Sequence, residues 1–181
     1  MLFGSYRINE RRENMTPRIS LQFKNGELNF YSCSVKIIEE HLDQIYDWEV
    51  DTMSDKWNAT KALKALKKMG NTMVCDVLLD QNVFAGSGNI VKNEVLFRIK
   101  IHPESLIAAL PAKKQRELVT ETRNYCFDFY EWKKQFVLRQ HWLAYSKKIC
   151  PRCNIPFTFK YLGKHHRRSF FCNNCQVLYL D

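Results

Sequence analysis

The feature that most constrains this chain is a repeated cysteine pattern near its C-terminus. Cys150 and Cys153 form one Cys-x-x-Cys pair, and Cys172 and Cys175 form a second pair after 18 intervening residues. Two such turns can present four thiolates to one tetrahedral ion, and a site closed by four protein ligands is typical of structural zinc. Two disulfides are the alternative. An odd total of seven cysteines and no secretion signal favour zinc.

The segment between the two pairs is expected to form a zinc-capped β-hairpin. Residues that favour β-structure flank Gly163, which is suited to the turn. A segment this small cannot fold by burial alone, so we expect the metal to fold it. Basic residues gather near the hairpin tip: Lys164, His165, His166, Arg167 and Arg168. Such a tip fits phosphate contacts, and a merely solvated turn is the alternative.

The other cysteines and the hydropathy pattern indicate the cellular compartment in which the protein is expected. Cys33, Cys75 and Cys126 share no ligand spacing, so we expect buried small side chains in a reducing, intracellular compartment. No apolar run reaches 18 residues, so no membrane span is expected. The N-terminal stretch also lacks the apolar core of a signal peptide.

Composition indicates a basic globular protein. Its 181 residues allow one or two domains, and 45% of them are hydrophobic. The 28 Lys and Arg residues exceed the 19 Asp and Glu residues, for a net charge of +9. This excess predicts attraction to polyanions, with nucleic acid the first candidate. A protein that is simply basic remains the alternative.

The first part of the chain is expected to be a small β-sheet. Apolar and polar residues alternate over 19–23 and again over 28–30, with Asn25-Gly26 as the expected turn. The stretch FGSYRI predicts a further strand. An acidic stretch, 39–55, follows and is expected to be a partly helical boundary segment.

The middle of the chain shows helical patterns. A helix is expected from Asn58, with Gly70 ending it and Asn71 capping the next, an apolar helix over 73–79. Helical spacing resumes after the turn Gly86-Ser87-Gly88-Asn89, whose free backbone N–H groups favour a phosphate. Most such turns only change chain direction, so this signal alone is weak.

A long helix is expected to start at Pro111. Its expected core positions are Leu118, Tyr125, Phe129 and Trp132. Strands at both ends and helices between them give an α+β fold class.

Two motifs together resemble one known family. The stretch LLDQNVFAGSGNIVKNEVLFRIKIHP, residues 78–103, resembles the helix-two-turn-helix of the formamidopyrimidine-DNA glycosylase / endonuclease VIII family. The four-cysteine segment, with Arg167 before it closes and Gln176 after it, resembles that family's zinc finger. The stretch MLFGSYRI resembles a late strand of the family's N-terminal β-sandwich. The implied domains are the end of a β-sandwich (1–47), a helix-two-turn-helix domain (48–145) and a zinc finger (146–181).

The resemblance implies a DNA glycosylase and AP lyase of base-excision repair, a monomer acting on damaged double-stranded DNA. Family members flip out a damaged base, cleave its glycosidic bond and break the backbone by β- or β,δ-elimination. Asn89, in its turn with Gly86 and Gly88, matches the family's phosphate-gripping asparagine. Arg167 matches the finger arginine, with Arg168 as its neighbour. Leu2 and Phe3 fall where the family inserts side chains into the gap left by the base.

One departure concerns catalysis. In the family an N-terminal proline amine is the nucleophile and the glutamate after it is the acid/base, whereas this chain starts Met-Leu-Phe. We therefore expect the chain to keep the DNA grip and to lack the cleavage chemistry. Three hypotheses follow: part of a bifunctional glycosylase/lyase, a naturally short non-catalytic DNA-binding module, or a zinc ribbon for protein contacts.

Overall fold

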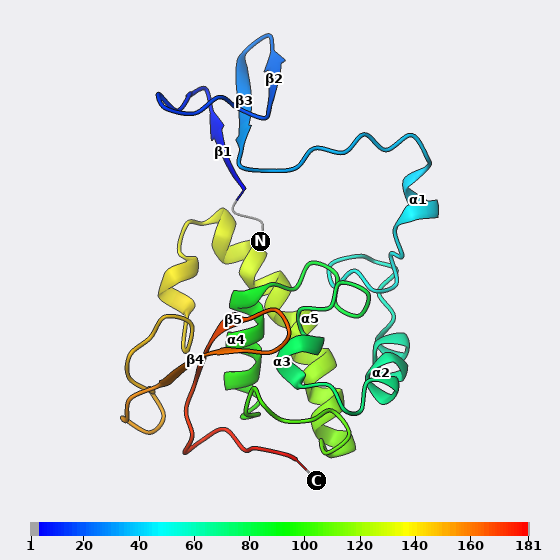
Figure 1. The fold of residues 1–181 in the computed structure, drawn as a ribbon, viewed down its shortest axis with the longest axis vertical. Coiled ribbons are helices and arrows are strands. Elements are labelled where there is room, and N and C mark those ends of the chain that lie inside the picture. The colour runs from blue at the N-terminus through cyan, green and yellow to red at the C-terminus, as the bar shows by residue number, and fades with distance from the viewer. Residues whose placement is uncertain (1–3, 181) are drawn as a thin grey trace. The chain divides into compact units, whose positions relative to one another are not determined.

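The computed structural model describes residues 4–180, which belong to two compact units that divide between residues 45 and 46. The predicted wedge residues Leu2 and Phe3 lie outside the described residues. The first unit is a small sheet with one short helix. The second holds the remaining helices and the terminal hairpin (Figure 1). The finer division into domains at residues 47 and 145 stays a prediction.

The first unit is built on a three-stranded antiparallel sheet. Its strands are β1 (Ser5–Ile8), β2 (Ile19–Phe23) and β3 (Gly26–Tyr31), in the order β1-β3-β2. Tyr31 is fully buried, and its hydroxyl accepts a hydrogen bond from the Arg12 N–H at 3.0 Å. The alternation over 19–23 and 28–30 therefore predicted the strands correctly.

The turn of the β2–β3 hairpin differs from the expectation. Phe23 pairs with Gly26, so Lys24 and Asn25 form the turn and Gly26 is the first residue of β3. The expected Asn25-Gly26 turn was therefore wrong by one residue. Gly26 serves instead to let the Asn9 side chain approach the start of β3 closely. A Cβ there would collide with the Asn9 side chain, whose Oδ1 accepts from the Glu27 N–H at 2.9 Å.

The boundary segment and the first long helix agree with the elements expected from the sequence. The acidic stretch contains only α1 (Leu42–Ile45). Helix α2 (Ala59–Lys68) begins after Asn58, whose Oδ1 caps it by accepting the Lys61 N–H at 3.0 Å. Asn71 does not cap the next helix, contrary to the expectation. That helix, α3 (Val74–Val77), starts after Met73, which makes no side-chain cap bond in the described structure.

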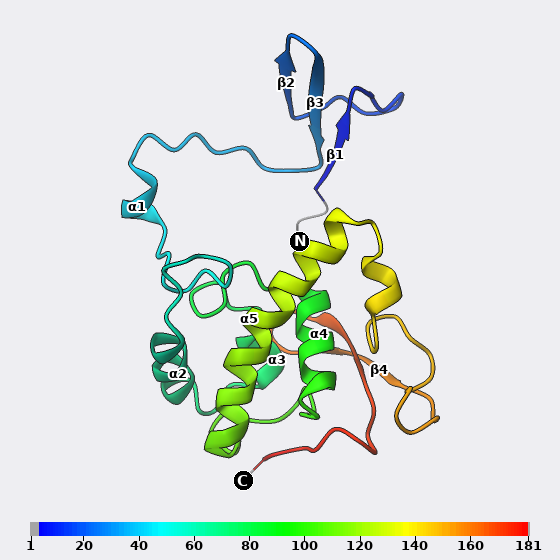
Figure 2. The same ribbon diagram turned by 180° about the vertical axis from the view of Figure 1, so that it is seen from behind.

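Helices α4 (Asn89–Arg98) and α5 (Ala112–Lys134) form the centre of the second unit. They lie side by side in both ribbon views, with α2 also against α5 and the hairpin against α4 (Figures 1 and 2). Leu118 and Tyr125 of α5 are fully buried, and Phe129 and Trp132 pack against the same core. The expected core face of this helix is confirmed.

The terminal hairpin consists of β4 (Thr158–Leu162) and β5 (Arg167–Phe171), paired antiparallel. Gly163 makes its turn with a φ of +72°. A Cβ at Gly163 would collide with the Asp76 carboxylate, which accepts the Lys164 N–H at 3.0 and 3.1 Å. Glycine is therefore required both by its backbone conformation and by the contact with α3.

The isolated cysteines follow the expectation in two cases of three. Cys75 and Cys126 are buried, and burial raises the pKa of Cys75 to about 12, so it is an unreactive thiol at neutral pH. Cys33 is partly exposed, so the expectation of burial was wrong there. It follows the short strand β3 in a sheet too small to enclose every apolar side chain.

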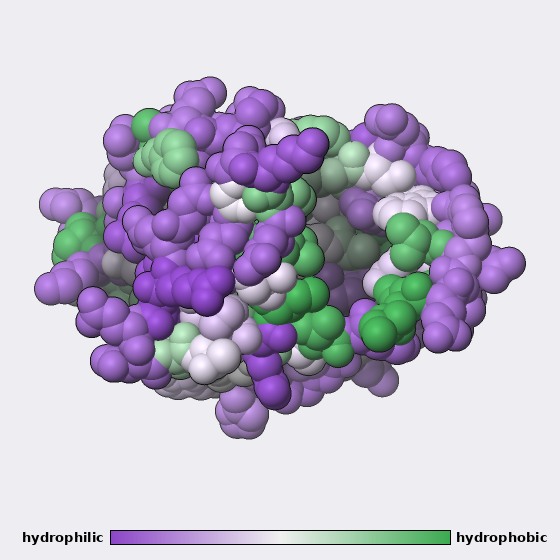
Figure 3. All heavy atoms as spheres, turned by 90° about the horizontal axis from the view of Figure 1, so that it is seen from above, coloured by the Kyte–Doolittle hydropathy of each residue, from purple (hydrophilic) through white to green (hydrophobic). Residues whose placement is uncertain are grey.

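One face of the molecule is mostly hydrophilic. In the space-filling view, hydrophilic side chains cover most of the visible face and hydrophobic ones show between them (Figure 3). No helix in residues 4–180 combines the length and apolar character needed to cross a bilayer.

Candidate nucleic-acid interface and metal centre

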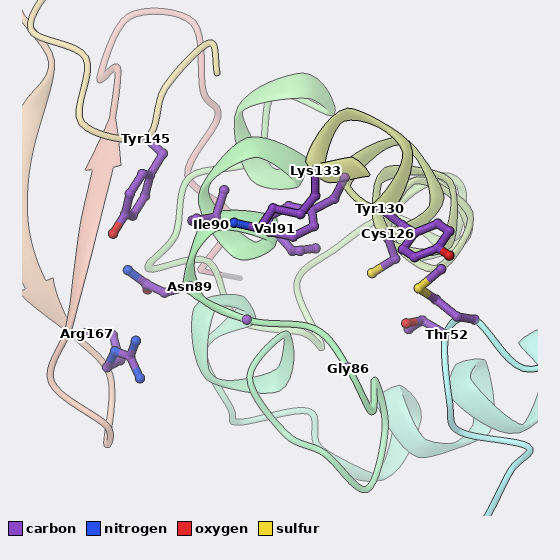
Figure 4. A pocket seen from close by; sticks show the side chains of 13 residues that line it. Thr52, Gly86, Asn89, Ile90, Val91, Cys126, Tyr130, Lys133, Tyr145 and Arg167 are labelled. Atoms are coloured by element: carbon purple, nitrogen blue, oxygen red, sulfur yellow. The ribbon is translucent and has the colours of Figure 1, made fainter. Parts of the chain in front are cut away.

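A pocket of about 470 Å³ lies between the start of α4, the last turns of α5 and the hairpin. Asn89 and Arg167 line it from α4 and from β5 and lie on the same side as Tyr145, while Thr52, Cys126 and Tyr130 lie on the other side (Figure 4). Its lining also includes Gly86, Gly88, Met53, Ile90, Val91, Phe129, Lys133 and Tyr145. Four of the predicted site residues, Gly86, Gly88, Asn89 and Arg167, thus meet at one pocket.

The glycine turn before α4 is braced from inside. Gln81 Oε1 accepts the Gly86 N–H at 3.1 Å, and Gln81 Nε2 donates to the Ser87 carbonyl at 3.0 Å. Gly86 has a φ of +89°, and Thr52 Oγ1 lies 3.3 Å from where its Cβ would be. The turn is therefore fixed before any ligand binds.

The first turn of α4 leaves backbone donors available at the pocket. Gly88 is the N-cap residue, and a Cβ built on it would meet no described atom within 4 Å. The first N–H groups of a helix have no partner within the helix, and the N-terminus carries partial positive charge. The Asn89 side-chain amide adds an N–H₂ donor at the same turn, and its Oδ1 is buried without a hydrogen-bond partner among the described residues. This end of α4 can therefore receive an anion.

Helix α4 holds β5 by two buried polar side chains. Lys92 Nζ donates to the Arg168 carbonyl at 3.1 Å and to Ser169 Oγ at 2.8 Å. Asn93 donates to the same carbonyl at 3.2 Å and accepts the Phe170 N–H at 2.7 Å. These bonds fix the strand on either side of Ser169.

The strand geometry separates the two arginines. Side chains alternate between the faces of a strand. Arg167 is on the face of buried Ser169 and lines the pocket, whereas Arg168 is on the opposite, exposed face and is not among the pocket residues. The structure therefore brings Arg167, and not Arg168, to Asn89.

Lys92 has an unusual environment for a lysine. Its side chain is 1% exposed, and burial lowers its pKa from 10.5 to about 8, with nearby Arg167 acting in the same direction. Helical spacing predicted a helix after the glycine turn but did not show that α4 is enclosed on all sides.

Glu94 fixes the loop that carries Tyr145. It is fully buried, and its carboxylate accepts the backbone N–H groups of Leu143, Ala144 and Tyr145 at 2.7–3.0 Å. Sequence reasoning missed Gln81, Lys92, Asn93 and Glu94 as positioning residues. The available signal was the polar run Lys92-Asn93-Glu94 inside an otherwise apolar helix.

The four cysteines of the two pairs form a cluster suited to one metal ion. Their Sγ atoms all lie within 4.8 Å of one another, and Cys150 and Cys175 Sγ are 3.8 Å apart. Zn–S bonds of about 2.3 Å give a tetrahedral edge of about 3.8 Å, so the cage has the right size. All seven cysteines are free of disulfides, and Asn174 Nδ2 donates to Cys153 Sγ at 3.2 Å. The donor set therefore fits a four-thiolate metal site.

The four-cysteine segment is fastened to α4 and to the loop after it. Arg152 donates to the Phe97 carbonyl, and its guanidinium lies 3.6 Å from the centroid of the Phe97 ring. Gln176 accepts the Cys172 N–H at 2.9 Å and donates to the Ile101 carbonyl at 2.8 Å. The cage thus connects directly to the helix that starts at the pocket.

Comparisons with known proteins identify the fold and the family. The formamidopyrimidine-DNA glycosylase H2TH domain model matches residues 49–126, which include the turn and α4. The chain is 34% identical to mouse (Mus musculus) endonuclease 8-like 3 over 96% of this chain and 30% of that protein. It is 33% identical to bovine (Bos taurus) endonuclease 8-like 2 over 97% of this chain and 56% of that protein. The chain therefore spans about a third to just over half the length of these relatives.

Solved structures share the fold. A Lactococcus lactis formamidopyrimidine-DNA glycosylase bound to DNA with an abasic site matches with a TM-score of 0.80 at 20% identity, over 96% of this chain and 70% of that one. A viral DNA glycosylase matches with a TM-score of 0.76 at 21% identity, over 98% of this chain and 75% of that one. The chain belongs to the formamidopyrimidine-DNA glycosylase / endonuclease VIII family, a family of DNA-repair glycosylases.

Proposed function

We propose that this chain binds damaged DNA by gripping the phosphates beside an extruded nucleotide. The observation that carries the proposal is the meeting of Asn89 and Arg167 at one pocket (Figure 4). The first supplies an amide beside the free N–H groups of a helix start, and the second supplies a guanidinium. Both groups are suited to phosphate oxygens.

The rest of the pocket suits the extruded base. Beyond the polar rim, the lining is largely apolar and aromatic, with Ile90, Val91, Phe129 and Tyr130. A base removed from its stack needs a replacement for the stacking it has lost. A volume of about 470 Å³ is within the range of small-molecule sites. Asn89 and Arg167 would then bind the phosphates of the same nucleotide whose base lies in the apolar part of the pocket.

Relatives support a role in base-excision repair. One structural neighbour is bound to DNA that contains an abasic site, and the curated relatives are endonuclease 8-like proteins. We take the metal to be a single structural zinc ion held by the four cysteines, since a thiolate set without an open position is typical of structural zinc. Zinc would keep the hairpin rigid so that Arg167 stays beside Asn89.

The test is binding to a duplex with one abasic site, measured by fluorescence anisotropy. Asn89→Ala and Arg167→Ala should each weaken binding by roughly 1–3 kcal/mol, because each removes a phosphate contact. Lys113→Ala, an exposed lysine on α5, should have a smaller effect. Arg168→Ala is the closest comparison, since it removes the same charge one residue from the pocket, and on this duplex without a single-stranded tail it should weaken binding less than Arg167→Ala does. Equal losses for all four variants would contradict a specific grip.

Cleavage of DNA by the 181-residue chain is a separate question. Our prediction is binding without efficient cleavage, and borohydride trapping on abasic DNA tests it. Among the described lysines, Lys92 is buried away from a substrate, whereas Lys133 is exposed at the pocket. Efficient trapping that is lost in Lys133→Ala would overturn the prediction and identify the amine. Binding without trapping would fit either a glycosylase that needs further residues or a non-catalytic DNA-binding module.

A further inference from the structure

The outer face of the terminal hairpin carries a row of aromatic side chains. Phe159 and Tyr161 come from β4 and Phe170 from β5, and Trp142 and Tyr145 continue the row from the preceding loop. Consecutive ring centroids in the order Trp142, Tyr145, Phe170, Phe159, Tyr161 are 5.0, 5.5, 5.2 and 5.3 Å apart. We refer to these five residues as the aromatic row.

The row lies on the side of the hairpin that does not pack on α4. The inner face of β5 buries Ser169 and Phe171 completely or almost so. On the outer face, Phe159 is 48% exposed and Tyr161 is 59% exposed. Two large rings are therefore left in solvent on an element that already has a buried face, which is unfavourable unless something covers them.

The segment of the chain that carries the row is strongly basic. No Asp or Glu occurs between Glu131 and Asp181, whereas ten Lys or Arg residues do. Arg168 is on the outer face directly across from Tyr161 in the strand register. Carboxylates from elsewhere in the chain also contact this segment: Glu104 lies 3.7 Å from Lys160, Asp76 accepts the Lys164 N–H, and Glu94 accepts the Tyr145 N–H from the α4 side. An occupant with negative charge as well as flat apolar surfaces matches this face.

The row is continuous with the proposed grip. Tyr145 lines the pocket and also contacts Phe170 of the row. Arg167 enters the pocket, and its neighbour Arg168 lies on the face of the row. A strand whose phosphate is held at Asn89 and Arg167 would therefore meet the row within the next few nucleotides.

We propose that the aromatic row stacks unpaired bases of the DNA strand that leaves the pocket, with Arg168 beside their phosphates. Exposed aromatic rings in a cationic surface bind single-stranded nucleic acid in this way, because every base has a face to stack and every nucleotide a charge to neutralise. The inference rests on the proposed DNA grip and extends it from one nucleotide to the adjoining unpaired strand.

The experiment compares three DNAs that each contain one abasic site: a blunt duplex and duplexes with a short 5′ or 3′ single-stranded tail next to the site. The tails carry 2-aminopurine, whose fluorescence falls when it stacks. Wild-type protein should bind one tailed DNA more tightly than the blunt duplex and should quench its 2-aminopurine. The double variant Phe159→Leu/Tyr161→Leu keeps apolar side chains but should lose the quenching, and its affinity for that tail should fall about fivefold or more.

Two controls keep the result interpretable. Phe23→Leu changes an exposed aromatic residue in the other unit and should leave both the affinity for the tail and the quenching unchanged. The double variant Phe159→Leu/Tyr161→Phe keeps one aromatic ring and should restore quenching. Unchanged tail binding in the double variant, or an equal loss on blunt and tailed DNA, would overturn the inference. Sedimentation measures self-association. If wild-type protein self-associates and the double variant does not, while quenching is unchanged, the row would be a protein contact instead. Failure of the proposed grip is distinct, because Asn89→Ala and Arg167→Ala would then weaken binding to the blunt abasic duplex no more than Lys113→Ala does.

Discussion

At the scale of single residues, Lys92 connects the two halves of the pocket. It belongs to the helix that starts with Asn89, and it holds the strand that begins with Arg167. Its burial lowers its pKa to about 8, so in the folded protein it loses its proton far more easily than in the unfolded chain. Protein stability should therefore depend on pH through this one side chain.

The sign of this dependence follows from proton linkage. Between pH 8 and about 10.4 the unfolded state still binds the Lys92 proton while the folded state releases it, so stability rises with pH. The full contribution is roughly 3 kcal/mol, the value of the lowered pKa. We expect wild-type protein to gain this stability relative to Lys92→Met across that window, measured by urea unfolding at each pH. Lys64→Met, which changes an exposed lysine, should show no such difference.

Two glycines at the site should respond differently to the same substitution. Gly163→Ala places a methyl group against the Asp76 carboxylate at a φ of +72°, so the protein should be destabilised by roughly 1–3 kcal/mol. Gly88→Ala meets open space at a φ of −133° and should change stability little. Thermal unfolding compares the two variants. A larger loss of stability for Gly88→Ala would contradict the structure.

At the scale of elements, the terminal hairpin and the helices depend on different interactions. The helical core around Leu66, Phe84 and Leu118 contains no metal ligand. The small cluster at the cage consists of Phe97, Phe157 and Ala144 with the four cysteines themselves. The hairpin should therefore depend on the metal and the helices should not.

Metal removal tests this separation. Chelation should release one zinc per chain and abolish hydrogen-exchange protection in β4 and β5, while α2 and most of α5 stay protected. DNA affinity should fall with the hairpin, because Arg167 is then no longer held beside Asn89. Metal analysis by mass spectrometry gives the stoichiometry. Freshly purified, reduced protein without a bound metal would contradict the assignment of the cage.

At the scale of the whole molecule, charge governs association with DNA. A net charge of +9 attracts any nucleic acid, whereas the pocket supplies only a few phosphate contacts. Affinity should fall steeply with salt, and Arg167→Gln should reduce the slope of log affinity against log salt by about one. Lys64→Gln, far from the pocket along the chain, should leave the slope nearly unchanged. Equal slopes for all three proteins, measured by anisotropy titration, would indicate non-specific binding only.

The sequence alone determined the local elements and the metal cage. Strand alternation predicted β2 and β3, the asparagine before an apolar period predicted the start of α2, and the paired Cys-x-x-Cys turns predicted the cluster of four cysteines. These features depend on neighbouring residues, so spacing along the chain is enough to read them. The resemblance of the two motifs to a glycosylase family was confirmed by the comparisons.

Only the tertiary structure determined which of these residues and elements lie in contact. Sequence could not separate Arg167 from Arg168, because a shift of one residue in the hairpin register exchanges the faces of a strand. The register is set by Lys92 and Asn93 from a distant helix. The burial of Lys92 and Glu94 was equally hidden, since it exists only when α5, the hairpin and the 143–145 loop enclose α4 together. Gly26 and Gly163 serve contacts with Asn9 and Asp76, which lie far away in the sequence, and only the folded chain brings these pairs together.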